Sequence, residues 1–462
     1  MTLIKSISGI RGTIGGKEGD ALTPPDVVKY AAAYGSWAIK AASGKRKIVI
    51  GRDARVSGAW VSSLVSATLT AMGIHVIDAG LATTPTVEMA VKYENAAGGI
   101  ILTASHNPGN WNALKLLNQE GEFISAEEGQ YILDLADSGQ IEFAKVTQQG
   151  QYTQDNSFLQ RHIDDIIAHP LVDKATIAAK NFSIVVDGVN SVGGVAVPAL
   201  LAALGVKRVE KLFCEPTGIF EHNPEPLPEN ITHICQKLYA GQHHLGIVVD
   251  PDVDRLALVC EDGTPFGEEY TLVAVADYVL SKTGKGNTVS NLSSTRALAD
   301  VTQKYGGQHF SSAVGEVNVV KVMRECQAII GGEGNGGIIV PDLHYGRDAL
   351  IGIALFLSHL ANFKGSAKML RNKYPSYYIS KNKIELTSGI NTEAVLRAMK
   401  EKYSRQPINE VDGVKIDFGR EWVHLRRSNT EPIIRIYAES DSEATAEHLA
   451  QKIISDIKEM IK

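Results

Sequence analysis

Short runs of β-branched and apolar residues alternate along this chain with segments whose apolar residues recur at helical spacing. In the first part, the alternation predicts strands at 47–50, 74–78 and 99–102 and a helix at 59–72. The same alternation of strand-like and helical segments begins again after about residue 150 and after about residue 263. Such repetition favours α/β layers with largely parallel sheets, because parallel strands need long connections that are usually helical.

The last part of the chain has a different pattern. From about residue 374, strands are predicted at 413–418, 422–425 and 433–438 with no helix between them, which indicates an antiparallel sheet. We therefore predict an α/β protein in which three similar mixed α/β domains are followed by an α+β C-terminal domain. The predicted domains are 1–152, 153–262, 263–372 and 373–462. Each has one polar loop beside a strand, and we expect these four loops to meet in a central cleft.

Composition excludes several classes of protein. The chain of 462 residues is 44% hydrophobic and 21% charged, which is close to the globular average and argues against a disordered or fibrous protein. The net charge of −6 is spread without blocks of like charge, so nucleic acid is not an expected partner. The four cysteines are far apart, and we find neither a signal peptide nor a membrane span. We therefore expect a cytoplasmic protein that contacts no membrane.

The first polar loop, Thr103–Pro108, follows a predicted strand and can present Ser105 as a nucleophile at the edge of the sheet. Alternatively, Ser105 only caps a helix or turns the chain. A Ser–His hydrolase pair is disfavoured, because neighbouring side chains in an extended segment point to opposite sides and His106 would face away from Ser105. Lys115 could stabilise a phosphate group, or act as a base if its pKa is lowered.

The second loop carries Asp250, Asp252 and Asp254 directly after the predicted strand 246–249. Carboxylates at every second residue can converge on Mg²⁺ or Ca²⁺ if the loop curls. A calcium-binding EF-hand needs glycine at the sixth position of the loop, where this chain has Arg255. The remaining alternative is a solvated acidic turn, and we favour a metal site because three aligned carboxylates repel one another without a cation.

The third loop, Gly331–Gly337, is rich in glycine and carries Glu333 and Asn335, whose side chains suit the hydroxyl groups of a sugar. It is not a nucleotide-binding P-loop, because no Gly-Lys-Ser/Thr follows the glycines. A flexible turn is the alternative interpretation.

The fourth loop resembles a phosphate cradle in its composition, since guanidinium groups, hydroxyl groups and an amide lie together. The alternative is a polar hairpin loop with solvated arginines. The candidate ligands in this loop are Arg426, Ser428, Asn429 and Thr430.

Three other segments carry candidate residues. Arg11, in a glycine-rich segment near the N-terminus, could reach the same cleft. Residues 51–58 contain two arginines and an aspartate that we interpret as an Arg–Asp cluster supporting the first sheet. His344 and Arg347 are candidates for contacts with a sugar or a second phosphate.

Taken in order, these motifs resemble those of the α-D-phosphohexomutase family, which includes phosphoglucomutase, phosphomannomutase and phosphoglucosamine mutase. The resemblance covers essentially the whole chain. Its motifs are Ser-Gly-Ile-Arg-Gly at 8–12, Thr-Ala-Ser-His-Asn-Pro at 103–108, Asp-Pro-Asp-Val-Asp-Arg at 250–255, Gly-Glu-Gly-Asn-Gly-Gly at 332–337 and Arg-Arg-Ser-Asn-Thr-Glu-Pro at 426–432.

The resemblance implies an intramolecular phosphotransferase with four domains around a central cleft. Ser105 would carry the phosphoryl group and bind Mg²⁺ together with the three aspartates, and Lys115 would be the general acid or base. We add Arg11 and His106 to the predicted catalytic group. The implied substrate contacts are Arg255, Glu333, Asn335, Arg347, Arg426, Ser428, Asn429 and Thr430. The expected cofactors are Mg²⁺ and glucose- or glucosamine-1,6-bisphosphate as activator.

The sugar loop ends in Gly337 and carries Asn335 where many members have serine, which is similar to the archaeal-type branch that includes phosphoglucosamine mutases. The expected reaction is therefore the conversion of glucosamine 6-phosphate to glucosamine 1-phosphate. Glucose and mannose phosphates are the alternative substrates, and a sugar phosphatase or a non-catalytic sugar-phosphate sensor is a remote alternative. The expected partner is a small hexose phosphate, and the expected assembly is a monomer or homodimer.

Overall fold

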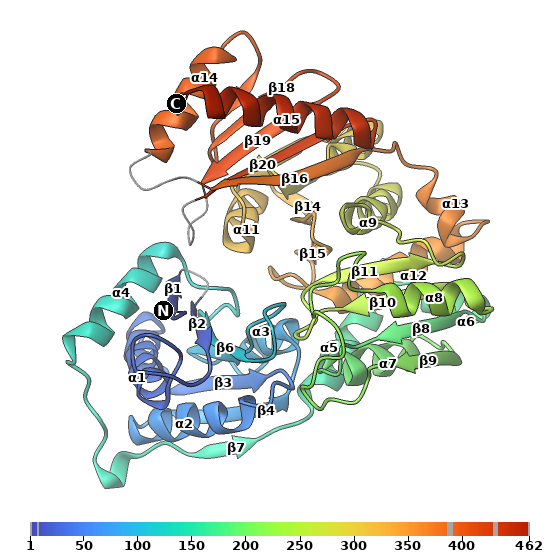
Figure 1. Ribbon diagram of the computed structural model, residues 1–462. Coiled ribbons are helices and arrows are strands. Elements are labelled where there is room, and N and C mark those ends of the chain that lie inside the picture. The colour runs from blue at the N-terminus through green and yellow to red at the C-terminus, as the bar shows by residue number, and fades with distance from the viewer. Residues whose placement is uncertain (1, 7–8, 386–390, 428–432, 461–462) are drawn as a thin grey trace. The chain divides into compact units, whose positions relative to one another are not determined.

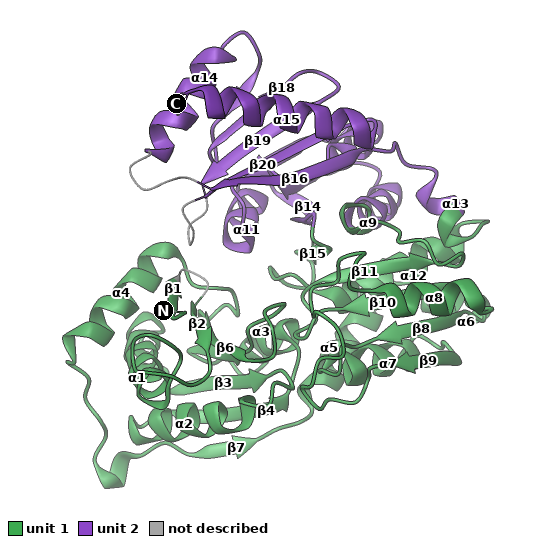
Figure 2. Ribbon diagram, in the orientation of Figure 1, with its two compact units in different colours: residues 1–271, 335–368 green, residues 272–334, 369–462 purple. Residues whose placement is uncertain are grey.

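The computed structural model describes residues 2–6, 9–385, 391–427 and 433–460 (Figure 1). The chain divides into two compact units (Figure 2). The first unit comprises residues 1–271 and 335–368, and the second comprises residues 272–334 and 369–462. The chain therefore leaves the first unit and returns to it before completing the second.

The first sheet has seven strands in the order β1-β2-β6-β5-β3-β4-β7. Strands β4, β5 and β7 join β3 in a parallel arrangement, whereas β1, β2 and β6 add an antiparallel edge. The strands are β1 Ile4–Ser6, β2 Gly9–Thr13, β3 Lys47–Arg52, β4 His75–Leu81, β5 Gly98–Leu102, β6 Trp111–Leu117 and β7 Tyr152–Gln154. The helices of this part are α1 Pro24–Ala41, α2 Gly58–Ala71, α3 Thr84–Tyr93 and α4 Ala126–Ser138, with a 3₁₀ turn at Val146–Gln148.

The second sheet has the order β11-β10-β8-β9, and its last strand in the chain is antiparallel to β10. Its strands are β8 Ser183–Asp187, β9 Arg208–Leu212, β10 Leu245–Val249 and β11 Leu256–Cys260, and the nearby helices are α5 Phe158–Ala168, α6 Lys174–Ala179, α7 Gly193–Ala203 and α8 Thr232–Ala240. Strands β8 and β10 are buried along their whole length, as expected for a central strand covered on both faces.

In the second unit, β13, β12 and β14 form a parallel layer. These strands are β12 Asn287–Asn291, β13 His309–Ser312 and β14 Ala328–Glu333, and β15 Gly337–Ile339 follows in the first unit. The helices of this stretch are α9 Glu268–Thr283, α10 Ala297–Lys304, α11 Glu316–Glu325, α12 Ala349–Asn362 and α13 Ala367–Arg371.

The C-terminal sheet is antiparallel throughout and has the order β16-β20-β19-β18-β17. Its strands are β16 Tyr378–Glu385, β17 Ile408–Asn409, β18 Val414–Asp417, β19 Trp422–Arg427 and β20 Ile433–Ser440. Helices α14 Thr392–Lys402 and α15 Glu443–Met460 pack their apolar stripes on one face of this sheet (Figure 1). The predicted fold class, mixed α/β domains followed by an α+β domain, is confirmed.

One feature corrects the predicted fold. The first sheet is mixed rather than largely parallel, because β6 returns directly after β5 through the Ser105 loop instead of crossing over through a helix. No helix in the described part of the chain is long and apolar enough to span a membrane.

Candidate active site

The Ser105 loop begins where the buried strand β5 ends. Ser105 itself has a φ of +49°, in the left-handed region, and its backbone N–H donates to the hydroxyl of Thr103 at 2.9 Å. The residue is only 7% exposed. The predicted extended conformation of this loop is therefore wrong, and so is the argument that His106 must face away from Ser105. Nδ1 of His106 lies 3.5 Å from Oγ of Ser105.

Arg55 holds the Ser105 loop in this conformation. Its fully buried guanidinium donates from Nε to Asp53 at 3.0 Å, and from Nη1 and Nη2 to backbone carbonyls of the loop. These carbonyls belong to Ser105, Asn107, Pro108 and Trp111. Our interpretation of residues 51–58 as support for the first sheet is therefore incomplete, because Arg55 also fixes the loop that carries the candidate nucleophile.

The metal loop, Asp250–Asp254, follows the buried strand β10, and all three of its aspartates are fully buried. Ser105 donates its hydroxyl to Oδ2 of Asp250 at 2.7 Å, which brings the first and second polar loops into direct contact. Oδ1 of Asp250 accepts from the backbone N–H groups of Asp254 and Arg255, both at 3.1 Å, so that the loop curls around this carboxylate. The structure thus brings together the serine and the acidic loop that the sequence predicted.

Two cations contact the metal loop. Lys115 donates from Nζ to Oδ2 of Asp252 at 2.7 Å and lies 3.6 Å from Oδ2 of Asp254. Arg347 donates from Nη2 to Oδ2 of Asp254 at 2.6 Å. The structure thus places Arg347, a predicted substrate contact, directly on the metal loop.

The residues present fit a divalent cation. A ligand atom from each of the three carboxylates can be chosen so that all lie within 4.8 Å of one another. Oδ1 of Asp252 and Oδ1 of Asp254 are buried and accept no hydrogen bond from the described residues. Buried acceptors are rarely left without a partner, and hard carboxylate oxygens are the ligands that such cations prefer. The acidic loop can therefore hold a metal ion.

Protonation equilibria reflect the crowding of these charges. Burial, followed by repulsion from Asp254 and Asp252, raises the pKa of Asp250 well above its ordinary value. Burial also works against the charge of Lys115, but attraction to Asp252 and Asp254 outweighs it and raises the pKa of this lysine. Lys115 is therefore a cation among these carboxylates, and its role as general acid or base stays a prediction.

The other predicted catalytic residues of the first unit lie close in the fold. Burial, and then the positive charge of Arg255, lowers the pKa of His106 to about 2, so this imidazole is neutral. Arg11 lies on β2 opposite Ala113 on β6, the strand that carries Lys115. Its Nε is buried without a hydrogen-bond partner among the described residues.

Nε of Arg255 is also buried without a hydrogen-bond partner among the described residues, and Nη1 of the same residue donates to Glu225 at 3.0 Å. Together with Arg11, this residue supplies buried donor capacity that suits an anion.

The sugar-loop residues are divided between the two units. Glu333 ends β14 in the second unit, where its Oε1 accepts from Asn291 at 2.8 Å and from the backbone N–H of Gly315 at 2.9 Å. Asn335 belongs to the first unit, and its Oδ1 accepts from the backbone N–H of Gly337 at 3.2 Å. The loop is thus a turn between β14 and β15 in which the side chains of both residues accept hydrogen bonds.

Of the predicted phosphate loop, the structure describes Arg426 at the end of β19, where Nη1 lies 3.5 Å from Oδ2 of Asp412. Ser428, Asn429 and Thr430 lie outside the described residues.

Sequence reasoning missed two contacts of the site. Besides Arg55, Thr84 at the start of α3 donates its hydroxyl to Oδ2 of Asp252 at 2.6 Å. The sequence gives one usable signal for this contact, a Thr-Thr-Pro-Thr run that predicts the start of a helix after β4.

Comparison with known proteins adds independent information. Four profiles of phosphoglucomutase/phosphomannomutase match the chain in order. They are α/β/α domain I at residues 3–142, domain II at 160–263, domain III at 267–377 and the C-terminal domain at 406–455.

Full-length relatives and solved structures agree. The chain is 32% identical to a phosphoglucomutase/phosphomannomutase of Thermococcus kodakarensis, covering 98% of this chain and 99% of the relative. It is 31% identical to a phosphoglucosamine/phosphogalactosamine mutase of Sulfurisphaera tokodaii, covering 98% of each. A crystal structure of a phosphoglucomutase/phosphomannomutase family protein from Burkholderia thailandensis aligns with a TM-score of 0.84 at 25% identity, over 99% of this chain and 98% of that one.

Proposed function

Because the chain belongs to the phosphoglucomutase/phosphomannomutase family of phosphohexomutases, we propose that it interconverts glucosamine 6-phosphate and glucosamine 1-phosphate. The reaction proceeds through a phosphorylated Ser105 and a 1,6-bisphosphate intermediate. The observation that carries the proposal is the 2.7 Å hydrogen bond from the Ser105 hydroxyl to Asp250, inside an acidic loop with two unpartnered carboxylate oxygens among the described residues.

We propose Mg²⁺ as the ion held by Asp250, Asp252, Asp254 and the seryl phosphate. Bound there, it supplies electrostatic stabilisation of the transferring phosphoryl oxygens. The chain's own residues provide the rest of the charge balance. Phosphoserine and three aspartates bring about five negative charges, which the ion alone does not offset. Lys115 and Arg347, both bonded to the loop, offset two more.

Positioning accounts for the transfer step. Arg55 and Thr103 hold Ser105 so that its Oγ points at Asp250, and the rigid loop keeps this oxygen in place when it gives or receives the phosphoryl group. Arg11 and Arg255, whose buried Nε atoms have no partner in the described part of the chain, are suited to bind the oxygens of the phosphoryl group. A trace of glucosamine- or glucose-1,6-bisphosphate would start the cycle by phosphorylating Ser105.

The remaining substrate contacts in this proposal come from the predicted sugar and phosphate loops. Glu333, together with Asn335 of the first unit, would bind sugar hydroxyl groups, and Arg426, Ser428, Asn429 and Thr430 would bind the phosphate that is not transferred. The intermediate must turn over between the two half-reactions, so the phosphate loop must accept the substrate in both orientations.

The choice of glucosamine phosphate rests on the relatives, several of which are named phosphoglucosamine mutases, and on the glycine that ends the sugar loop. Glucose and mannose phosphates are the second candidates, because another relative is named phosphoglucomutase/phosphomannomutase.

The substitution Ser105→Ala tests the reaction. We expect turnover of glucosamine 6-phosphate to fall by on the order of 10³-fold or more, because no other group in this mechanism carries the phosphoryl group. Ser66→Ala is a matched control, since Ser66 is a buried serine of α2 whose Oγ has no partner in the described part of the chain. Equal thermal stability of both variants excludes unfolding as the cause.

The assay compares glucosamine 6-phosphate, glucose 1-phosphate and mannose 1-phosphate. A tenfold preference in kcat/KM corresponds to about 1.4 kcal/mol of differential transition-state binding. Substantial turnover by Ser105→Ala would refute the phosphoserine mechanism. Release of inorganic phosphate instead of sugar isomerisation would identify a phosphatase.

A further inference from the structure

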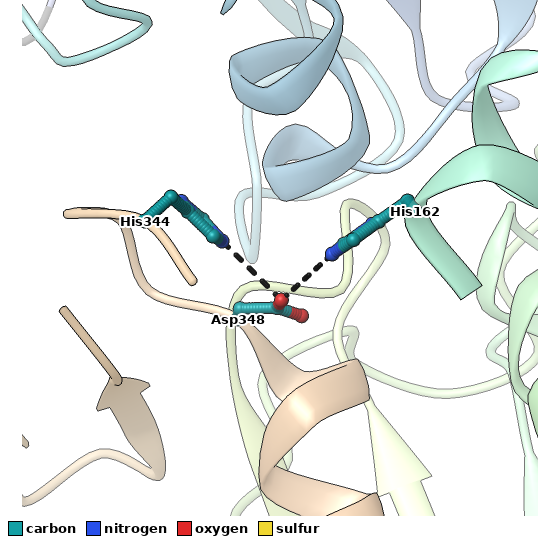
Figure 3. A group of neighbouring side chains, drawn as sticks. All are labelled: His162, His344 and Asp348. Carbon is teal, nitrogen blue, oxygen red and sulfur yellow. Dashed lines mark hydrogen bonds and ion pairs between the residues drawn. The ribbon is translucent and has the colours of Figure 1, made fainter. Parts of the chain in front are cut away.

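A second buried cluster of ionisable side chains lies in the first unit, built from three elements that are distant in the sequence. Glu88 comes from α3, His162 from α5, and His344 and Asp348 from the segment that leads into α12. All four are at most 4% exposed. Figure 3 shows both imidazoles pointing at the carboxylate of Asp348.

The carboxylate of Asp348 is saturated with hydrogen bonds. Oδ1 caps α12 by accepting from the backbone N–H groups of Leu350 at 2.8 Å and Ile351 at 3.4 Å. Oδ2 accepts from Nε2 of His162 at 3.0 Å and Nε2 of His344 at 3.3 Å (Figure 3). A carboxylate offers about four acceptor positions, and all are used here. The carboxylate of Asp348 therefore links the surrounding elements through hydrogen bonds and has no acceptor position left for a metal ion.

His344 is held between two carboxylates. Its Nε2 contacts Asp348, and its Nδ1 lies 3.3 Å from Oε2 of Glu88. Burial disfavours a charged imidazole, but the hydrogen bonds to Asp348 and Glu88 and the charges of these groups outweigh burial and raise the pKa of His344 to about 9. At neutral pH this imidazole is a cation that donates to Asp348 and forms an ion pair with Glu88. His162 is tied to the same helix as Glu88, because its Nδ1 lies 3.1 Å from the hydroxyl of Thr86.

The two helices that this cluster joins both hold the metal loop. At the start of α3, one turn before Glu88, the backbone N–H of Thr84 donates to the carbonyl of Asp252 at 2.9 Å. At the start of α12, the backbone N–H of Ala349 donates to the carbonyl of Val253 at 3.2 Å. Consecutive residues of the metal loop are thus anchored to the two helix ends that the cluster holds together.

Arg347 extends this connection to the next residue of the loop. It lies between His344 and Asp348 in the sequence, and its guanidinium contacts Asp254 at 2.6 Å. The neighbouring Gly346 packs so closely that a Cβ atom there would lie 1.9 Å from Oε2 of Glu88. The path of residues 344–348 is therefore set by the cluster, and the position of Arg347 follows from that path.

We propose that His344, clamped between Glu88 and Asp348, is a positioning residue that fixes Arg347 and the starts of α3 and α12 against the metal loop. Through these contacts it sets the affinity of the loop for its divalent cation and, with it, the rate of phosphoryl transfer. The second consequence rests on the proposed mutase function, whereas the first can be measured without turnover.

The primary test is Mg²⁺ affinity of His344→Gln by isothermal titration calorimetry at neutral pH. We expect binding about tenfold weaker than in the wild type and a fall in kcat that exceeds any change in the KM for sugar phosphate, because the neutral amide of this variant carries no charge to hold both carboxylates. His309→Gln is the matched control. His309 is a partly buried histidine of β13 bonded to Thr288 and Ser290, and its replacement should leave Mg²⁺ affinity unchanged.

The dependence of Mg²⁺ affinity on pH tests the charge of His344, to which a purely structural role would be insensitive. The ionisable groups facing His344 are Glu88 from α3, His162 from α5 and Asp348 from α12. Wild-type Mg²⁺ affinity should weaken as His344 loses its proton near pH 9. Glu88→Gln should shift this weakening to lower pH, because it removes one of the two negative charges that stabilise the cation. His344→Gln should abolish the pH-dependent step.

The outcomes are decisive even if His344→Gln folds poorly, because Glu88→Gln tests the same contact. Wild-type Mg²⁺ affinity in both variants, or an unshifted alkaline step in Glu88→Gln, would overturn the proposal. So would one equivalent of zinc in the purified wild type that is lost in His162→Ala, since a metal would then hold the cluster. If mutase activity is absent altogether, the proposed function fails, while the affinity measurements still decide this inference.

Discussion

Two buried clusters of potential metal ligands lie in the first unit, and they differ in how completely their carboxylate oxygens are hydrogen-bonded. In each cluster, ligand atoms of three side chains come within 4.8 Å of one another. In the acidic loop, Oδ1 of Asp252 and of Asp254 accepts no hydrogen bond from the described residues. In the histidine cluster, the carboxylate of Asp348 accepts four hydrogen bonds, two of them from imidazoles.

This difference in hydrogen bonding distinguishes a cluster that can bind an ion from a cluster that holds structural elements together. Both clusters bring three potential ligand atoms equally close together, so proximity does not distinguish the functions. A buried acceptor without a partner costs free energy that a bound ion can recover, whereas a saturated carboxylate gains nothing from an ion. The same reasoning applies to the arginines. Arg55 uses all its nitrogens on the Ser105 loop and Asp53, whereas Arg11 and Arg255 each have a buried Nε with no partner in the described ranges.

The largest effect should come from Asp250→Asn in the acidic loop. We expect kcat/KM to fall by on the order of 10³-fold, because a charged ligand is lost. Without metal, however, the variant should melt at the same temperature as the wild type or about 1–3 °C higher, since one of three mutually repelling buried carboxylates is gone. A kinetic assay in Mg²⁺ measures the first effect, and thermal denaturation in EDTA measures the second.

The matched change in the histidine cluster is Asp348→Asn. It should destabilise the protein by about 3 kcal/mol with or without Mg²⁺, because it removes the charge that both imidazoles contact. If Asp250→Asn lowered the melting temperature in EDTA as much as Asp348→Asn does, the distinction between the two clusters would be wrong.

A smaller effect is expected from Arg55→Ala. This variant tests whether Arg55, whose donors are all used in hydrogen bonds, serves to hold the Ser105 loop in position. Loss of the clamp should lower kcat by about 10²-fold, because a displacement of about 1 Å in the reacting groups is costly. Guanidinium ion added at non-denaturing concentration should restore part of the activity by refilling the buried site. Arg55→Lys keeps the charge but not the fork of donors, and it should remain impaired. Full activity of Arg55→Ala without guanidinium would contradict the clamp.

The smallest effect concerns stability at alkaline pH. The pKa of His344 is raised in the folded protein to about 9, above its unfolded value of about 6.5. Its contribution to stability is therefore complete below about pH 6.5 and is lost as the pH rises through about 9. On the order of 2 kcal/mol should be lost over this range in the wild type and not in His344→Gln. Melting temperatures of both proteins across the range measure the difference, and parallel curves would contradict it.

Local sequence patterns predicted much of the fold. The predicted strands 99–102 and 246–249 agree with β5 and β10, and the predicted helix 59–72 agrees with α2, each to within one residue at either end, because each segment has a clear periodicity. Helix α1 was missed, although its Thr-Pro-Pro-Asp start forms a capping box. The antiparallel partner β6 was missed because the pairing of strands is a tertiary property.

The candidate site was predicted in its chemical groups but not in its connections. Ser105 and the three aspartates follow apolar strands, so their loops could be found from the sequence, and the structure joins them. The donors that hold these loops could not be found in the same way. Arg55 acts through backbone carbonyls, which leave no trace in residue type, and the Thr-Thr-Pro-Thr run at Thr84 predicts the start of a helix but not its contact with Asp252. The left-handed backbone at Ser105 likewise has no local signal, because it is imposed by the contacts around the loop.

The path of the chain through the two units sets an order of assembly during synthesis. Ser105 and the acidic loop leave the ribosome early, but Arg347, which contacts Asp254, is encoded 93 residues after it. At about 5–20 residues per second, the nascent chain carries the acidic loop for roughly 5–20 s before Arg347 and the start of α12 are made. Throughout that interval the aspartates lack two of the contacts that hold them in the folded protein. A truncated product that ends before residue 344 would therefore retain the nucleophile and the acidic loop without the contacts from Arg347 and the start of α12.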